Sequence, residues 1–139
     1  MSREIKFRGK DIHTGRWVYG DLLHIGNSVA IHVARDKMCR FFIIDPDTIG
    51  EMAPVFYDAN NRPIYEGDIV EYHWVDPYDA DALGGVVTLC CGLWAANNDK
   101  LQEAYDLYRE SGYWEIIGNR WDNPELLAGG ADDEHIERR

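Results

Sequence analysis

Carboxylates gather around one short stretch of this sequence, and they are its side chains best suited to chemistry. Glu66, Asp68 and Glu71 lie close together in the chain. Two carboxylates in different environments can act as general acid and general base when both face a cleft. Acids beside a glycine in a turn also bind their own backbone amides. We therefore expect a turn here, and a carboxylate site near Glu66 and Asp68 is the enzyme alternative.

Other chemical signals in the sequence are weak. It has no Gly-x-Ser-x-Gly nucleophile and no Walker loop. No metal-ligand spacing occurs among the histidines, which are His13, His24, His32, His73 and His135, or among the cysteines, which are Cys39, Cys90 and Cys91. We expect no catalytic residue, no metal ligand and no cofactor, and a metal would need side chains that only the fold brings together.

The strand after this turn must position the acids. Gly67 accepts either sign of φ, so the corner formed by residues 66–68 should be sharp. Residues 69–74 then alternate between apolar or aromatic side chains and Glu71 or His73, which predicts a half-buried strand. The predicted binding residues flank this corner, and they are Tyr65, Glu66, Asp68 and Trp74.

Short strands and turns account for most of the remaining sequence. The pair Gly26 and Asn27 predicts a hairpin turn. Residues 39–44 are apolar on both faces, so we expect the most buried strand there. Residues 99–111 have apolar side chains at helical spacing, with Asn98 before them and Gly112 after them. They predict one amphipathic helix, with Tyr105 and Tyr108 as packing residues.

These elements predict a mainly β (α+β) fold. It would be a small SH3-like barrel or a strongly bent antiparallel sheet, with the amphipathic helix near the C-terminus. We expect a single domain over residues 1–127, with an N-terminal β part (1–52) and a barrel part (53–127) as the alternative. Residues 128–139 are charged and poor in apolar side chains, which predicts a mobile tail.

Several motifs together resemble the YopX family of phage and prophage proteins. They are Ile5 to Lys10, Thr14 to Gly20, Ile44 to Gly50, Tyr65 to Val70, Glu115 to Asn119, and Asn123 to Leu127. Residues 53–58 depart from the family's usual approach to the turn. The resemblance implies a phage- or prophage-encoded accessory protein and carries no established activity.

Charge is distributed unevenly along the chain. Residues 1–44 have a net charge of +4 and residues 45–139 of −15, for a total of −11. A basic stretch near aromatic side chains could bind nucleic acid, and its cations are Arg3, Lys6, Arg8, Lys10 and Arg16. The acidic remainder would repel phosphate, so nucleic acid is the alternative partner.

The preferred function is an interaction module that self-associates and binds an unknown host or phage protein. Split charges of this kind can also satisfy one another within the fold or across a symmetric dimer. The sequence has neither a long apolar run nor an apolar region near Met1. We therefore expect no membrane partner and a cytoplasmic location in a bacterial host.

Overall fold

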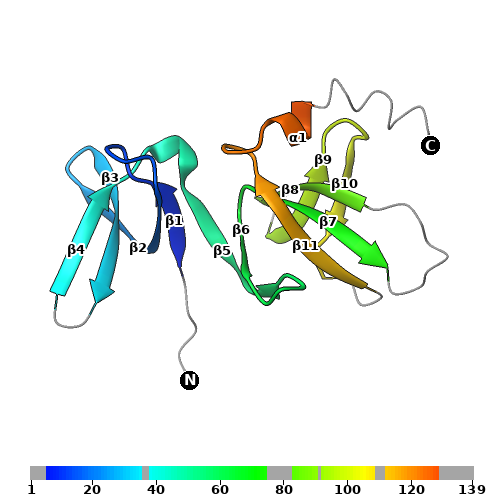
Figure 1. The fold of residues 1–139 in the computed structure, drawn as a ribbon, viewed down its shortest axis with the longest axis horizontal. Coiled ribbons are helices and arrows are strands. Elements are labelled where there is room, and N and C mark those ends of the chain that lie inside the picture. The colour runs from blue at the N-terminus through cyan, green and yellow to red at the C-terminus, as the bar shows by residue number, and fades with distance from the viewer. Residues whose placement is uncertain (1–5, 36–37, 75–82, 91, 109–111, 129–139) are drawn as a thin grey trace. The chain divides into compact units, whose positions relative to one another are not determined.

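Figure 1 shows the fold as a computed structural model, which describes residues 6–35, 38–74, 83–90, 92–108 and 112–128. Strands dominate these residues and form two antiparallel sheets, which confirms a mainly β fold. The chain divides into two compact units, Met1–Phe56 and Tyr57–Arg139. The organisation as one domain or two parts stays a prediction, and the proposed tail beyond Ala128 lies outside the described residues.

The first sheet has six strands in the order β4-β3-β2-β1-β5-β6. The strands are β1 (Phe7–Lys10), β2 (Trp17–Ile25), β3 (Ser28–Arg35), β4 (Met38–Ile43), β5 (Gly50–Tyr57) and β6 (Pro63–Tyr65). A short 3-10 helix, η1 (Pro46–Thr48), precedes β5. The hairpin expected at Gly26 and Asn27 joins β2 to β3. A bridge between Asp11 and Ile44 brings the end of β4 back to the end of β1, so the sheet is strongly curled.

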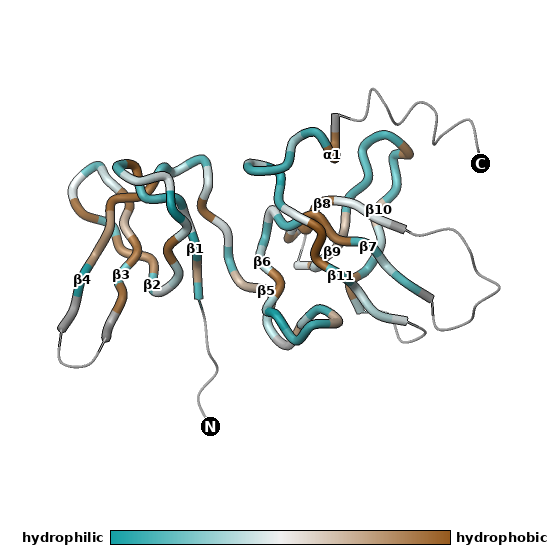
Figure 2. Tube along the Cα trace, in the orientation of Figure 1, coloured by the Kyte–Doolittle hydropathy of each residue, from teal (hydrophilic) through white to brown (hydrophobic). Residues whose placement is uncertain are grey.

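The second sheet has five strands in the order β10-β9-β8-β7-β11. The strands are β7 (Asp68–Trp74), β8 (Leu83–Cys90), β9 (Leu93–Asn98), β10 (Glu103–Asp106) and β11 (Gly112–Asn119), and α1 (Glu125–Ala128) follows them. Figure 2 shows hydrophobic stretches along β8, β9 and β11. The core is built on Val70, Tyr72, Val87 and Trp114, and the Tyr72 and Trp114 rings meet edge to face at 5.0 Å. This packing fixes β7, the strand that follows the corner.

The prediction of an amphipathic helix over residues 99–111 is wrong. The chain turns at Gln102, which has a φ of 55°, and then forms β10 against β9. Asn98 caps this turn instead of a helix, since its Oδ1 accepts from the N–H of Leu101 at 3.1 Å. Pairing with β9 outweighs the helical spacing. Tyr105 is half-buried, but Tyr108 is 71% exposed and does not pack as expected.

Residues 39–44 do not form the most buried strand. β4 lies at the edge of its sheet and pairs with β3 alone along its length, and Phe41 is 55% exposed. Figure 2 shows that β3 and β4 nevertheless carry hydrophobic stretches. A run of apolar residues shows only that a strand could be buried. Burial also requires another layer of the protein to cover both faces of that strand.

The SH3-like barrel is not confirmed, because neither sheet closes into a barrel in the described part of the chain. Among those same residues, no helix has both the length and the apolar character needed to cross a membrane.

Candidate functional site

The corner at residues 66–68 is held in the second unit by hydrogen bonds to the backbone and by contact with the Trp121 ring. The Asp68 carboxylate accepts from the N–H of Tyr65 at 2.8 Å. Gly67 has a φ of 95°, its N–H donates to the carbonyl of Val87, and its carbonyl accepts from Arg120. A Cβ added at Gly67 would lie 2.3 Å from the ring of Trp121. Glycine is therefore required twice here, by conformation and by space.

The predicted binding residues around the corner have different environments. Tyr65 is 4% exposed and Asp68 is 3% exposed. Their burial favours a structural role, and the bond to Tyr65 occupies the Asp68 carboxylate that the enzyme alternative needs. Glu66 is half-buried. Trp74 ends β7, but its side chain lies outside the described residues. A binding role for Glu66 and Trp74 stays a prediction.

The turn before the corner is organised by Asp58, whose side chain is fully buried. Its Oδ1 accepts from the N–H groups of Asn60 and Arg62, and its Oδ2 accepts from the Arg62 guanidinium at 3.0 Å and from the N–H of Ile116. Burial by itself would raise the pKa of Asp58. The bonds from Arg62, Ile116 and Asn60 together lower that pKa below its usual value. Asp58 therefore ties the turn to β11.

The basic stretch is placed on β1 and its neighbours. Arg8 is 4% exposed, and its guanidinium lies 4.6 Å from the centre of the Trp17 ring. The ammonium of Lys10 lies 5.4 Å from the same ring. Lys6 is half-buried and Arg16 is exposed, whereas Arg3 lies outside the described residues. Cations of the protein already occupy the Trp17 ring, which favours packing over base stacking.

Exposed apolar side chains share one face of β2, β3 and β4. We define this outer face by Tyr19, Asp21, Leu23, Ile25, His32 and Phe41, because alternation along β2 and the pairs Asp21↔His32 and His32↔Phe41 bring these residues together. Its four apolar members are all exposed. Among these apolar side chains, the Nδ1 atom of His32 lies 3.8 Å from a carboxylate oxygen of Asp21. The outer face therefore has the composition of a contact surface.

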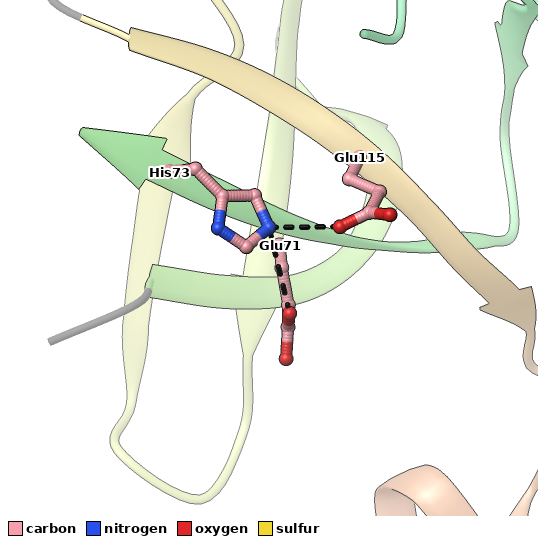
Figure 3. A group of neighbouring side chains, drawn as sticks. All are labelled: Glu71, His73 and Glu115. Carbon is pink, nitrogen blue, oxygen red and sulfur yellow. Dashed lines mark hydrogen bonds and ion pairs between the residues drawn. The ribbon is translucent and has the colours of Figure 1, made fainter. Parts of the chain in front are cut away.

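Two carboxylates and a histidine converge on the second sheet. Glu71 and His73 lie two residues apart on β7, so both point to one side of the sheet, and Glu115 of β11 is the direct partner of Glu71. Figure 3 shows the Nε2 atom of His73 facing both acids, at 2.9 Å from Glu115 and 3.7 Å from Glu71. We call these three residues the Glu-His-Glu cluster.

Comparison with known protein families shows which family this chain belongs to. Residues 6–128 match the YopX protein family, which is nearly the whole chain. The chain belongs to the YopX family. The resemblance inferred from the corner and the flanking motifs is thus confirmed.

A solved structure has the same fold as this YopX chain. The crystal structure of protein EF1440 from Enterococcus faecalis matches with a TM-score of 0.52 and 22% sequence identity. The match covers 91% of this chain and 99% of that one. At this identity the likeness establishes a shared fold and says nothing of activity. No curated protein matches the chain.

The sequence analysis did not single out two residues whose side chains make long-range contacts in this YopX chain. Asp58 stands in a turn-rich segment, but nothing nearby indicates that its carboxylate reaches Ile116. Glu115 begins one of the family motifs, but that motif does not indicate a site, and the pairing with β7 brings Glu115 to Glu71 and His73. The signal available for the cluster was the Glu71 and His73 spacing, which places both on one face of a strand.

Proposed function

We propose that this YopX chain is a phage- or prophage-encoded accessory protein that acts as an interaction module and self-associates. The observation that carries the proposal is the outer face of β2, β3 and β4. Phe41, Leu23 and Ile25 leave large apolar side chains in water on this face. Exposed large apolar side chains that gather on one face of a sheet mark protein contact sites.

A second copy of the chain is the occupant that this face fits best. A symmetric dimer places the same surface on both copies, so the surface must complement itself. Asp21 and His32 carry complementary groups in the middle of the outer face, with Phe41 and Leu23 beside them. A two-fold axis through this centre would pair Asp21 of each copy with His32 of the other and would cover the apolar side chains around them.

Sedimentation velocity over a wide range of concentrations tests self-association. We expect the wild-type protein to dimerise and Phe41→Ser to weaken dimerisation at least tenfold, since a large aromatic side chain that a contact covers carries much of its energy. Tyr108→Ser is the matched control, because Tyr108 is also an exposed aromatic residue but lies in the other unit. It should leave dimerisation unchanged.

Two outcomes would contradict the proposal. One is a wild-type protein that stays monomeric at every concentration. The other is equal dimerisation of Phe41→Ser and wild type, with Leu23→Ser as a second variant of the same face. If the wild type is monomeric and the outer face instead retains a stoichiometric host protein that Phe41→Ser loses, the surface is an interface but self-association is wrong.

Nucleic acid is the alternative ligand, and the same samples test it. Binding through Lys6, Lys10 and Arg16 would make the affinity for single-stranded DNA fall steeply with salt. We expect no such binding, because Arg8 and Lys10 lie against Trp17. A salt-dependent affinity that Lys10→Ala and Arg16→Ala reduce would overturn this expectation.

A further inference from the structure

The Glu-His-Glu cluster is set by the register of two strands. Glu71 and His73 are fixed on one side of β7, which has β8 and β11 as its neighbours. Glu115 pairs directly with Glu71 across β11. On the β8 side, the partner of Glu71 is Gly84. That flank therefore has no side chain opposite Glu71.

The spacing of the three ligand atoms suits a small cation. One ligand atom from each residue lies within 4.8 Å of the other two. A tetrahedral ion with bonds of about 2.0–2.1 Å to nitrogen and oxygen separates its ligands by about 3.3 Å. The His73 Nε2 distances of 2.9 Å to Glu115 and 3.7 Å to Glu71 lie on either side of that value. Small rotations of the two carboxylates would complete the arrangement.

Electrostatics at the cluster also favour a cation. Like charges directly opposite each other on neighbouring strands destabilise a sheet, and Glu71 faces Glu115 in this way. The segment from Asp45 onward carries a net charge of −15, so its field attracts positive ions. A divalent ion would remove the repulsion between the two carboxylates and would take the His73 Nε2 atom as its third ligand.

The His73 ring is oriented before any ion arrives. It stacks on Tyr113, its direct partner on β11, with the ring centres 5.2 Å apart. The three side chains are 32% to 42% exposed, which leaves a path from solvent. Imidazole nitrogen selects transition ions over Mg²⁺ and Ca²⁺, which prefer oxygen alone.

We propose that Glu71, His73 and Glu115 bind a divalent transition-metal ion of the Zn²⁺ type. The three side chains supply one nitrogen and two oxygen ligands, and a fourth coordination position stays open to water or to a ligand. Zinc sites with three protein ligands and an open position are the kind that exchange ligands or activate water. Sites of closed, purely structural type have four protein ligands.

Titration of the untagged, reduced, full-length protein with Co²⁺ tests the site through the visible absorption of the bound ion. Zn²⁺ then competes in the same cuvette. We expect one Co²⁺ per chain that Zn²⁺ displaces, and we expect His73→Gln to weaken this binding at least tenfold. Glu115→Gln and Glu71→Gln should each weaken it as well, and Mg²⁺ should not compete.

His24→Gln is the matched control, because His24 also lies on a strand and is exposed, but belongs neither to the outer face nor to the Glu-His-Glu cluster. It should bind Co²⁺ as the wild type does. Thermal midpoints without metal establish that each variant is folded. The imidazole signals of His73 in the wild-type protein give a readout that needs no variant, since Zn²⁺ should shift them before those of any other histidine.

Three results would overturn the proposal. They are no saturable Co²⁺ binding by the wild-type protein, equal binding by His73→Gln and wild type, and a Zn²⁺ titration that leaves the His73 signals in place. In each case the cluster would be an ion pair between His73 and the two glutamates, without a metal.

Discussion

Both sheets place a histidine directly opposite an exposed aromatic residue, and yet the two positions differ in chemistry. His32 pairs with Phe41 on the first sheet, and His73 pairs with Tyr113 on the second. Among the described residues, His32 has one carboxylate nearby, that of Asp21 at 3.8 Å, and exposed apolar side chains share its face of the sheet. His73 has two carboxylates within 3.7 Å.

The register of the strands decides which side chains surround each histidine, and therefore what each cross-strand pair can do. His32 has Asp21 opposite it on β2 and Phe41 opposite it on β4, so the Asp21 and His32 pair becomes the polar centre of a contact surface. On the second sheet the register places Glu115 opposite Glu71, next to His73. The histidine and the two carboxylates therefore form a candidate ion site. The difference lies in the residues that long-range pairing places alongside each histidine.

Replacing the corner glycine should have the largest effect on stability. It should also show most clearly how the second sheet differs from the first. Gly67→Ala forces a Cβ against Trp121 at a positive φ, and we expect a loss of about 3 kcal/mol in the free energy of unfolding. Gly26→Ala in the β2–β3 hairpin also has a positive φ but meets no atom within 4 Å, so it should lose about 1 kcal/mol.

Denaturant unfolding of these two glycine variants measures the difference. Equal losses for Gly67→Ala and Gly26→Ala would mean that the Trp121 ring does not hold the corner, and the account of the second unit would be wrong.

The next largest effect should come from Asp58. Asp58→Asn removes the charge that Arg62 and three N–H groups stabilise, and we expect a loss of about 2 kcal/mol at neutral pH. The lowered pKa of Asp58 means that its contribution is fully present above about pH 4 and is lost as the pH falls through the folded-state value. Asp58→Asn should therefore show a shallower loss of stability in acid.

Asp45→Asn is the counterpart in the first unit, because Asp45 caps η1 through one bond to the N–H of Asp47. Asparagine caps as well as aspartate, so the change should stay within about 0.5 kcal/mol. Thermal unfolding at several pH values compares the variants. An acid profile of Asp58→Asn that matches the wild type would show that the Asp58 carboxylate does not stabilise the fold.

The smallest expected effect concerns the aromatic partners of the two histidines. Tyr113→Leu removes the ring stacked on His73, and we expect a loss of about 0.5 kcal/mol together with a severalfold weaker affinity for Co²⁺. Phe41→Leu on the first sheet should leave the Co²⁺ affinity unchanged. If both variants bind Co²⁺ as the wild type does, Tyr113 does not orient the ligand.

Local sequence patterns predicted the elements that depend on neighbouring residues. Gly26 marks the hairpin because the turn there has a positive φ, and Gly67 marks the corner for the same reason. The strand at residues 69–74 was predicted from alternation, and β7 occupies nearly the same residues. These predictions use interactions within a few positions of the chain.

Long-range pairing accounts for the features that the sequence did not predict. Residues 99–111 have helical spacing, but β9 offers a strand partner and Leu107 reaches the core instead of Tyr108. Residues 41–44 form an apolar run, but the sheet ends at β4, so Phe41 stays exposed. Glu115 joins His73 only through the pairing of strands that are distant in sequence.

Native mass spectrometry with Zn²⁺ present tests the central claim, that the two sheets carry separate binding surfaces. We expect a wild-type dimer with one Zn²⁺ per chain, a Phe41→Ser monomer that keeps its Zn²⁺, and a His73→Gln dimer without the ion. Loss of the dimer and the ion together in either variant, or a monomeric wild-type protein without Zn²⁺, would contradict it.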